Sequence, residues 1–326
     1  MRQRAIWKCL AMSVLALAMG ASHAAAADYP ARQIRLVVPF TPGGGTDIMA
    51  RVIAAEMTKN TGQTVVVENK PGAGGIIGTE YVARASPDGY TLMIGSVSTI
   101  SINPSLYTKM SVNPLEDLMP AGAISSTPSI FAVPADLDVS TLQEFIEYAK
   151  SRPGSINYGS AGVGTSHHLA GELFKMQTGV HAQHIAYKGS SPAALSLMRG
   201  ESQFLIANIP SLQAALDGDR IKPLAVTSLN RAKQFPDLPT VVESGLPEFE
   251  VVVWYGMFAP KNTPEEVVGR INEEIRKAVS SPTVQKQLIT EGAEPMVATL
   301  AEFEQIIMRD YEKWKRVIEA SGIQLE

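Results

Sequence analysis

Short apolar runs alternate with helical patterns along almost the whole chain, and this alternation constrains the fold more than any other feature. The runs expected as strands are 34–38, 64–67, 90–94, 156–159, 184–187, 204–207, 224–227 and 251–258. The patterns expected as helices in the same part of the chain are 47–59, 77–85, 165–177 and 192–198. Alternation of this kind predicts an α/β architecture with largely parallel sheets.

Local signals predict where several helices begin and end. Ser140 with Gln143 has the spacing of a capping box for a helix that ends near Lys150. Thr263 precedes a proline and two glutamates, which indicates an N-cap followed by a proline at the first helical position. Thr299 and Glu302 predict the start of a last helix that runs to about residue 320.

The chain contains no linker rich in glycine, serine or proline that would separate two independent domains. Two α/β halves without a linker indicate two lobes joined by crossing strands, and the candidates are Ser125–Val133 and Val251–Phe258. We therefore predict one lobe from 28–127 plus 254–326, which is discontinuous, and a second lobe from 128–253. About 300 residues are enough to bury a large core in such an arrangement.

The first residues resemble a secretory signal peptide. Arg2, Arg4 and Lys8 precede an apolar core at 10–19, and small residues suited to cleavage end at Ala27. The core is too short for a membrane span, so we predict removal of residues 1–27 and export. The single cysteine, Cys9, lies within this segment and before its apolar core. We therefore predict neither lipidation nor a disulfide.

The charge balance excludes several classes of partner. The whole chain has 28 basic and 32 acidic residues, and the signal segment carries three of the basic ones. The mature chain thus has 25 basic residues (28 less three) against 32 acidic residues, a net charge of −7. No basic cluster is present in the sequence, which argues against nucleic acid or an anionic membrane as partner.

Four junctions between a strand and a helix are rich in glycine and hydroxyl side chains. The first is Pro39–Asp47, its counterpart is Tyr158–His168, and the others are Gly95–Thr99 and Tyr187–Pro192. Glycines let a ligand approach the backbone, and a helix N-terminus offers unpaired N–H groups and a positive dipole end. Because ligands of open parallel sheets bind beyond the carboxyl ends of strands, these junctions predict a cleft for a small anion.

Signals for catalysis and metal binding are weak. The four mature histidines, His167, His168, His181 and His184, lack the convergent spacing of a zinc site, and packing or capping is the alternative. The turn at 159–162 has the wrong spacing for a serine hydrolase elbow. Asp47 is a possible general base but an acidic residue in the first turn of a helix is usually a cap. We predict no catalytic residue, no metal and no cofactor.

Ordered motifs over nearly the whole mature chain carry a family resemblance. They are Tyr29-Pro30, 34–40, Pro42–Asp47 with Arg51, Val67–Gly75, Pro87–Leu92, His168–Phe174, Tyr187–Gly189, Leu224–Ser228 and Ala259-Pro260. Through these motifs the chain resembles the solute-binding proteins of tripartite tricarboxylate transporters, the Bug family. The resemblance implies a two-lobe periplasmic binding protein fold of the type II, Venus flytrap kind, with a mostly parallel sheet in each lobe.

The resemblance also implies function and partners. We expect a monomeric, non-enzymatic periplasmic protein that captures a small carboxylate: a dicarboxylate or tricarboxylate, an aromatic acid or an acidic amino acid. It would deliver this ligand to integral-membrane transporter subunits. The alternative is a sensing module that presents its closed form to a two-component sensor, and an exported hydrolase or metal enzyme is a third, less favoured hypothesis.

In such proteins the ligand carboxylate is held by backbone amides and hydroxyls of two glycine-rich turns, partly through water. By motif, the implied ligand-binding residues are Phe40, Thr41, Gly44, Thr46 and Asp47 in one lobe, and Ser160, Ala161, Gly164, Thr165 and Ser166 in the other. Ser96, Ser98, Lys188 and Asn208 complete the predicted set. His167 and Lys188 are either sources of positive charge near the ligand or exposed side chains, and Trp254 and Tyr255 either stack on the ligand or pack in the core.

One departure from the family pattern bears on specificity. Many relatives read Phe-Asp-Asn-Leu-Pro-Ser where this chain reads Ile206-Ala207-Asn208-Ile209-Pro210-Ser211. If the missing aspartate faces the cleft in relatives, ligands with an ammonium group are less favoured here. If it serves the structure, Ala207 says nothing about specificity.

Overall fold

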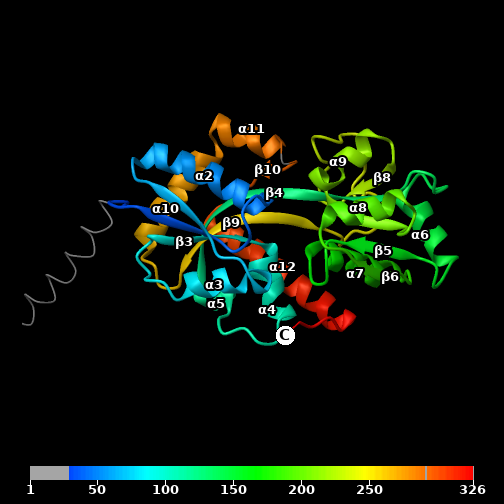
Figure 1. Cartoon of the computed structure of the whole chain (residues 1–326), viewed down its shortest axis with the longest axis horizontal. Helices are drawn as coiled ribbons and strands as arrows, with labels where there is room; N and C mark the ends of the chain where they lie inside the picture. Colours follow the sequence, from blue (N-terminus) through cyan, green and yellow to red (C-terminus); the bar gives the residue numbers. More distant parts are fainter. Residues whose placement is uncertain (1–28, 291, 326) are drawn as a thin grey trace, which may run out of the picture.

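The computed structural model describes residues 29–290 and 292–325, which form two lobes (Figure 1). The predicted signal peptide and its cleavage point lie outside the described residues. Within the described part of the chain, no helix has the length and apolar character needed to cross a membrane.

The described residues form a sheet of ten strands, eight of which follow the hydrogen-bonded order β2-β1-β3-β9-β4-β7-β5-β6, while β8 and β10 branch off by pairing with β4. The strands are β1 Ile34–Val38, β2 Val65–Asn69, β3 Thr91–Ser96, β4 Leu118–Pro134, β5 Asn157–Ser160, β6 Gln183–Ala186, β7 Phe204–Asn208, β8 Ile221–Val226, β9 Val252–Pro260 and β10 Glu294–Pro295. Parallel ladders join β2, β1 and β3 in one lobe and β6, β5 and β7 in the other, whereas β4 and β9 run antiparallel to their neighbours. The α/β prediction is confirmed, and each lobe holds a mixed sheet.

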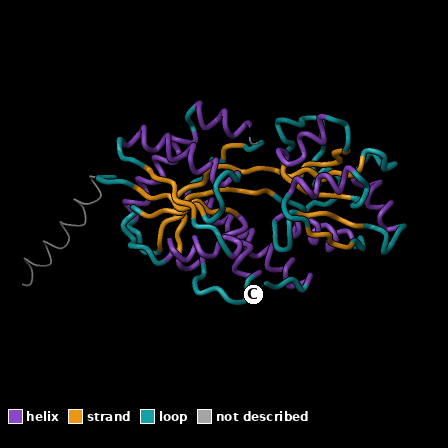
Figure 2. The backbone as a smooth tube through the Cα atoms, viewed as in Figure 1, coloured by secondary structure: helices purple, strands orange, loops and turns teal. Residues whose placement is uncertain are grey.

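Helices cover both faces of each half of the sheet (Figure 2). They are α2 Gly45–Thr61, α3 Ile76–Ala83, α4 Asn103–Leu106, α5 Pro114–Asp117, α6 Leu142–Lys150, α7 Ser166–Thr178, α8 Ser190–Met198, α9 Ile209–Asp217, α10 Glu265–Val279, α11 Pro282–Thr290 and α12 Leu300–Ser321, with short irregular helices η1 Ala73–Gly75 and η2 Ser98–Ile102. Strands covered on both faces are mostly apolar, as in β7 and the second half of β4, which explains why these runs in the sequence are continuous rather than alternating.

Two long strands, β4 and β9, connect the lobes (Figure 1). Strand β4 pairs with β9 as far as Pro128 and with β7 and β8 from Ser129 onward, so it changes partners at one step of the chain. Thr227 links the two crossing segments at this step. Its hydroxyl oxygen accepts a hydrogen bond from Ser129 N at 2.9 Å, and the hydroxyl donates one to Val251 O at 2.5 Å. The predicted lobe boundaries at 127/128 and 253/254 lie within these strands and stay predictions.

The core is divided by the sheet. In lobe 1, Leu36 and Val38 pack with residues of α2, α10 and α11, whereas Val37 packs on the opposite face with residues of η2 and α12. In lobe 2, Ile130 faces α8 and α9, and Phe131 faces α6 and α7. Helix α12 packs against η2 and α4 of lobe 1 and against α7 of lobe 2. It therefore supports the connection between the lobes from one side.

Most predicted helix ends are confirmed, and two caps are corrected. The capping box of α6 consists of Thr141 and Glu144, not Ser140 and Gln143, because the carboxylate of Glu144 can accept from two backbone N–H groups at once. Thr263 does not cap α10, since its hydroxyl donates to Pro260 O at 2.8 Å, and Pro264 is not the first helical residue but the N-cap residue of α10, which begins at Glu265. The box formed by Thr299 and Glu302 begins α12 as predicted.

Candidate functional site

A cleft of about 590 Å³ lies between the lobes, and residues from both lobes line it. Its lining residues are Phe40, Thr41, Gly44, Thr46, Gly74, Ser96, Ser98, Asn103, Leu106, Tyr107, Ala161, Val163, Gly164, Thr165, Ser166, His167, Gly189, Ser190, Asn208, Val253 and Tyr255. All four junctions that the sequence singled out contribute to this list, two from each lobe. The structure thus brings them together at one place.

A buried aspartate organises the turn of lobe 1. The Asp47 carboxylate accepts hydrogen bonds from Gly43 N at 2.9 Å, Arg51 Nε at 2.9 Å and Asn69 Nδ2 at 2.9 Å. Asn69 also donates to Phe40 O, which fixes the other end of the turn. The Arg51 guanidinium is the largest cause that lowers the pKa of Asp47 to about 2. Asp47 is therefore an anion that shapes the turn from behind, and it is not among the residues that line the cleft.

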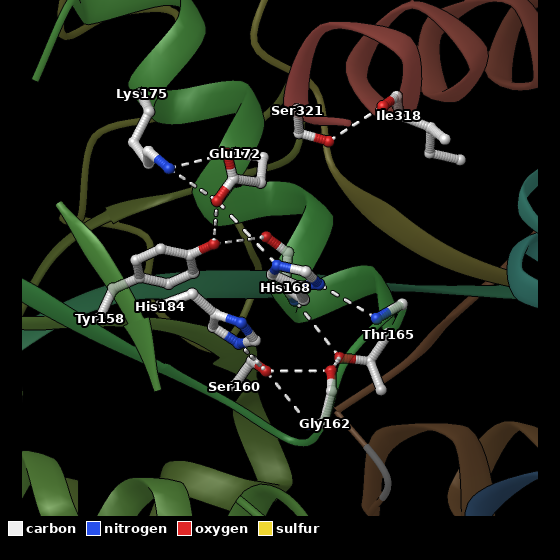
Figure 3. A network of polar contacts seen from close by, with 11 residues as sticks. Tyr158, Ser160, Gly162, Thr165, His168, Glu172, Lys175, His184, Ile318 and Ser321 are labelled. Atoms are coloured by element: carbon white, nitrogen blue, oxygen red, sulfur yellow. Dashed lines mark hydrogen bonds and ion pairs between the residues drawn. The ribbon is translucent and has the colours of Figure 1, made fainter. Parts of the chain in front are cut away.

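Two stacked histidines organise the turn of lobe 2 (Figure 3). The rings of His168 and His184 lie 3.7 Å apart between centroids. His168 Nδ1 accepts from Gly164 N at 3.0 Å, and His184 Nε2 is 2.7 Å from Ser160 Oγ. Ser160 Oγ also accepts from Gly162 N, so this hydroxyl is turned inward toward its own turn. The two imidazoles therefore hold the backbone of the turn from inside lobe 2.

The surroundings keep both of these histidines neutral. Burial, followed by the proximity of His184, lowers the pKa of His168 to about 4, and burial also lowers the pKa of His184. Beyond the pair, Glu172 accepts from Tyr158 at 2.5 Å and from Lys175 at 2.8 Å (Figure 3). Protonation of His168 at Nδ1 would remove the acceptor of the Gly164 N–H group, so the turn in this form requires the neutral ring.

Four helix N-termini meet at the cleft. Gly44 precedes α2, Thr165 precedes α7, Gly189 precedes α8 and Asn208 precedes α9, and all four residues line the cleft. Only the Thr165 side chain caps its own helix; the other three helices have no side-chain cap at this end. The first N–H groups of a helix have no acceptor within it, so this end of the cleft offers hydrogen-bond donors and positive dipole ends.

None of the described residues that line the cleft has a lysine, arginine, aspartate or glutamate side chain. The donors are instead backbone N–H groups, serine, threonine and tyrosine hydroxyls, and the amides of Asn103 and Asn208. Such a set recognises an anion by hydrogen bonds from neutral groups, as helix N-termini do for carboxylates and phosphates.

Most of the predicted binding residues lie at the cleft, and three do not. Asp47 is buried behind the turn, Ser160 is bonded to His184, and Lys188 is exposed outside the lining. Gly164 lines the cleft, but its N–H group already donates to His168. Ligand contact by each residue of the set stays a prediction.

The sequence reasoning missed several lining residues. Asn103, Leu106 and Tyr107 lie in or next to a short helical stretch without a motif. For His167 the sequence left open a place near the ligand or an exposed side chain, and the structure places it, buried, in the lining. Strand alternation separates the two aromatic candidates of β9, because Tyr255 lines the cleft whereas Trp254 is buried and donates to Asp310 at 2.8 Å. The alternation of side chains along a strand would therefore have predicted that only one of these two neighbours faces the cleft.

Ala207 lies in the core of lobe 2. It is fully buried, pairs with Ile130 of β4 and packs among the residues that α8 and α9 cover. It is absent from the lining of the cleft, whereas the next residue, Asn208, is present. In this chain the side chain at position 207 is therefore part of the core and does not face the cleft.

A larger cavity of about 810 Å³ lies within lobe 1. It is lined by residues of η2, α5, β4, β9, α10 and α12 and of the loop 261–264, among them the charged Lys261, Glu265 and Glu304. Residues of lobe 2 do not contribute to it, so closure of the lobes would not change it. The cleft between the lobes is therefore the better candidate for a ligand site.

Comparisons with known proteins agree with this geometry. The family model described as tripartite tricarboxylate transporter family receptor matches residues 49–323. The protein BugT of Bordetella pertussis is 36% identical over 307 residues, which cover 94% of this chain and 94% of BugT. The structure of Rpa4515 from R. palustris with adipate is 36% identical, with a TM-score of 0.77, and covers 91% of this chain and 99% of that one. MatC from Rhodopseudomonas palustris with bound malate is 31% identical, with a TM-score of 0.73, and covers 89% and 100%.

Proposed function

We propose, because this chain belongs to the tripartite tricarboxylate transporter family of receptors, that its cleft captures a small organic carboxylate for delivery to the membrane subunits of such a transporter. The family consists of periplasmic binding proteins that act as receptors and not as enzymes. We further propose that residues 1–27 direct export to the periplasm and that the protein acts as a monomer.

The observation that carries the proposal is the convergence of four helix N-termini on a cleft whose described lining has no charged side chain. Backbone N–H groups and hydroxyls favour an anion without a neutralising lysine or arginine. A ligand with a net positive charge would find no carboxylate there. Small acids are thus the class that the cleft suits best.

Two relatives were solved with small acids of this class. Rpa4515 was solved with adipate and MatC with malate, and both are dicarboxylates. For this chain the candidates are dicarboxylates and tricarboxylates, aromatic acids and acidic amino acids. The apolar side chains of Leu106, Val163 and Val253 at the cleft can pack against the carbon chain or ring of such an acid.

Binding would involve closure of the lobes. The donors of α2 belong to lobe 1 and those of α7, α8 and α9 to lobe 2, so a ligand that contacts both sets holds the two lobes together. A ligand that makes more contacts in the closed form shifts the population toward that form. The single step at which β4 changes partners is suited to serve as the hinge.

A thermal-unfolding screen tests the proposal. The purified mature protein is heated with each member of a carboxylate library and with the matched amide or alcohol of each acid. Because a ligand that binds only the native state stabilises it by about 2.7 kcal/mol at a hundredfold excess over Kd, at least one acid should raise Tm clearly. If no acid does so, or if amides and alcohols act equally well, the proposed function is wrong.

A further inference from the structure

The segment that follows α12 returns toward α4 of lobe 1 and pairs with the chain there (Figure 1). Gly322 ends α12 in the left-handed region, with φ 69°, and so turns the chain. Leu325 then forms a parallel bridge with Tyr107. Its N–H group donates to Leu106 O at 2.8 Å, and its carbonyl oxygen accepts from Thr108 N at 3.0 Å. Backbone hydrogen bonds thus hold Leu325 on lobe 1.

The side chain of Leu325 faces the other lobe. Gly164 lies in the turn before α7 of lobe 2, and a Cβ atom there would lie 2.5 Å from Leu106 Cδ2 and 3.2 Å from Leu325 Cδ1. The two leucines of lobe 1 therefore pack directly against the backbone of this glycine. Leu106 is buried in the core, and Leu325 is partly buried against the same cluster of apolar residues. The two lobes thus share an apolar contact at this place.

This contact adjoins the cleft. Leu106 and Tyr107 line the cleft from lobe 1, and Gly164 and Thr165 line it from lobe 2. Leu325 is not among the described lining residues, so its substitution can affect a ligand only through the residues that it positions. Apolar surface buried between the lobes returns to water when they separate, and the contact therefore favours the form in which the lobes approach each other.

On this basis we propose that Leu325 is a positioning residue of the cleft: with Leu106 it holds the Gly164 turn of lobe 2 against lobe 1 and limits how far the lobes separate without a ligand. The ring of His168 holds the same turn from inside lobe 2, because it accepts from Gly164 N at 3.0 Å. Loss of the Leu325 side chain should therefore move lobe 2 as a body rather than distort the turn. This role goes beyond the proposed function, and only its effect on ligand affinity rests on that function.

A distance between two spin labels, one on each lobe, tests this role without any ligand. The only cysteine of the chain is Cys9, so a protein of residues 28–326 can be labelled selectively at Lys59→Cys and Lys150→Cys. Both positions are exposed, the first near the end of α2 in lobe 1 and the second at the end of α6 in lobe 2. The width and mean of the distance distribution then report how far the lobes separate.

Leu325→Ala should lengthen or broaden this distribution, because the shorter side chain no longer packs against Gly164. Leu325→Met keeps a long apolar side chain and should match wild type. Val297→Ala is the control, since Val297 is an apolar residue of lobe 1 that is 87% exposed, and it should also match wild type. An unchanged distribution in Leu325→Ala, or an equal change in Val297→Ala, would overturn the role of Leu325. If Leu325→Ala does not fold, Leu325→Val provides the same comparison.

Calorimetric titration and stopped-flow kinetics with the acid that raises Tm most extend the test to binding. Leu325→Ala should raise Kd about fivefold, because the form that contacts the acid from both lobes is less populated. Most of this change should lie in the dissociation rate, and Val297→Ala should stay within about twofold of wild type. An unchanged Kd in Leu325→Ala would overturn the effect on binding. If wild type binds no acid, the proposed function fails, while the label distances still decide the role of Leu325.

Discussion

At the scale of single residues, Gly44 is the position where a side chain should block the ligand without disturbing the fold. A Cβ atom at Gly44 would have Thr41 O at 3.9 Å as its nearest neighbour, and its backbone φ of −81° suits any residue. By contrast, a Cβ atom at Gly164 would lie 2.5 Å from Leu106. Gly44 is therefore a clean probe of the cleft, whereas Gly164 is not.

Gly44→Val should lower the affinity for the best acid at least about tenfold, because the side chain enters the space beside the α2 N–H groups. The substitution should lower the free energy of unfolding by about 1 kcal/mol, since valine is a poor N-cap residue. Calorimetric titration and urea unfolding measure the two quantities. Gly269→Val, at an exposed and open position of α10, is the control. Unchanged affinity in Gly44→Val would mean that the lobe 1 turn does not bind the carboxylate.

Asp47 should contribute stability that depends on pH. Its pKa is about 2 in the folded protein and 3.8 as the ordinary value, so the unfolded chain binds more protons between these values. The contribution is therefore complete above about pH 4 and is lost as the pH falls toward about 2. Asp47→Asn should lose about 1–3 kcal/mol of unfolding free energy at pH 7 and much less at pH 2.

Urea unfolding at the two pH values measures this difference. Asp136→Asn, an exposed carboxylate in a loop of lobe 2, is the control and should change neither value. Equal destabilisation by Asp47→Asn at both pH values would contradict the role of the charge.

At the scale of elements, the junction between β5 and α7 should be sensitive to mild acid. Burial lowers the pKa values of His167, His168 and His184 below the ordinary 6.5, with about 4 for the first two. The unfolded chain then binds more protons between about pH 6.5 and about pH 4, so stability falls as the pH falls through this window. Protonation also removes the acceptor that His168 provides to Gly164.

The variant with His168→Gln and His184→Gln should show a shallower loss of unfolding free energy between pH 7 and pH 5 than wild type. The slope should not vanish, because His167 titrates in the same window. Replacing the exposed His181 by Gln should leave the slope unchanged. A double variant with the slope of wild type would show that the stacked pair is not responsible.

The elements also show what sequence patterns can and cannot locate. The strand at 34–38 was predicted to the residue, because four of its five residues are apolar and buried and only Arg35 is exposed. The capping box of α6 was placed one residue early, since adjacent Ser140 and Thr141 both suit an N-cap and only the backbone direction decides between them. The pairing of His168 with His184 was missed, because it joins a helix to a neighbouring strand and leaves no local spacing.

The same limit applies to the site. Glycine-rich turns after strands predicted the cleft, since turn chemistry is local and the ends of parallel strands meet at one edge. Asn103 and Tyr107 reach the cleft through tertiary packing, which no local pattern reports. Asp47 was found as a motif residue, but only the three-dimensional contacts show that its carboxylate turns away from the cleft.

At the scale of the whole molecule, two crossing strands and one helix connect the lobes. Strands β4 and β9 carry the chain between them, and α12 packs on elements of both. Asp310 of α12 is buried and accepts from Trp254 of β9, while Lys313 pairs with the same carboxylate at 2.8 Å. We therefore expect a motion of the lobes to centre on the step at Pro128 and Ser129, where β4 changes partners.

The central claim is that a small carboxylate binds between the lobes. A crystal structure of the protein with the acid that raises Tm most tests this claim directly. We predict carboxylate oxygens within about 3.2 Å of backbone N–H groups at the N-termini of α2 and of at least one helix of lobe 2. An acid found in the lobe 1 cavity beside Lys261, or held by one lobe alone, would contradict the claim.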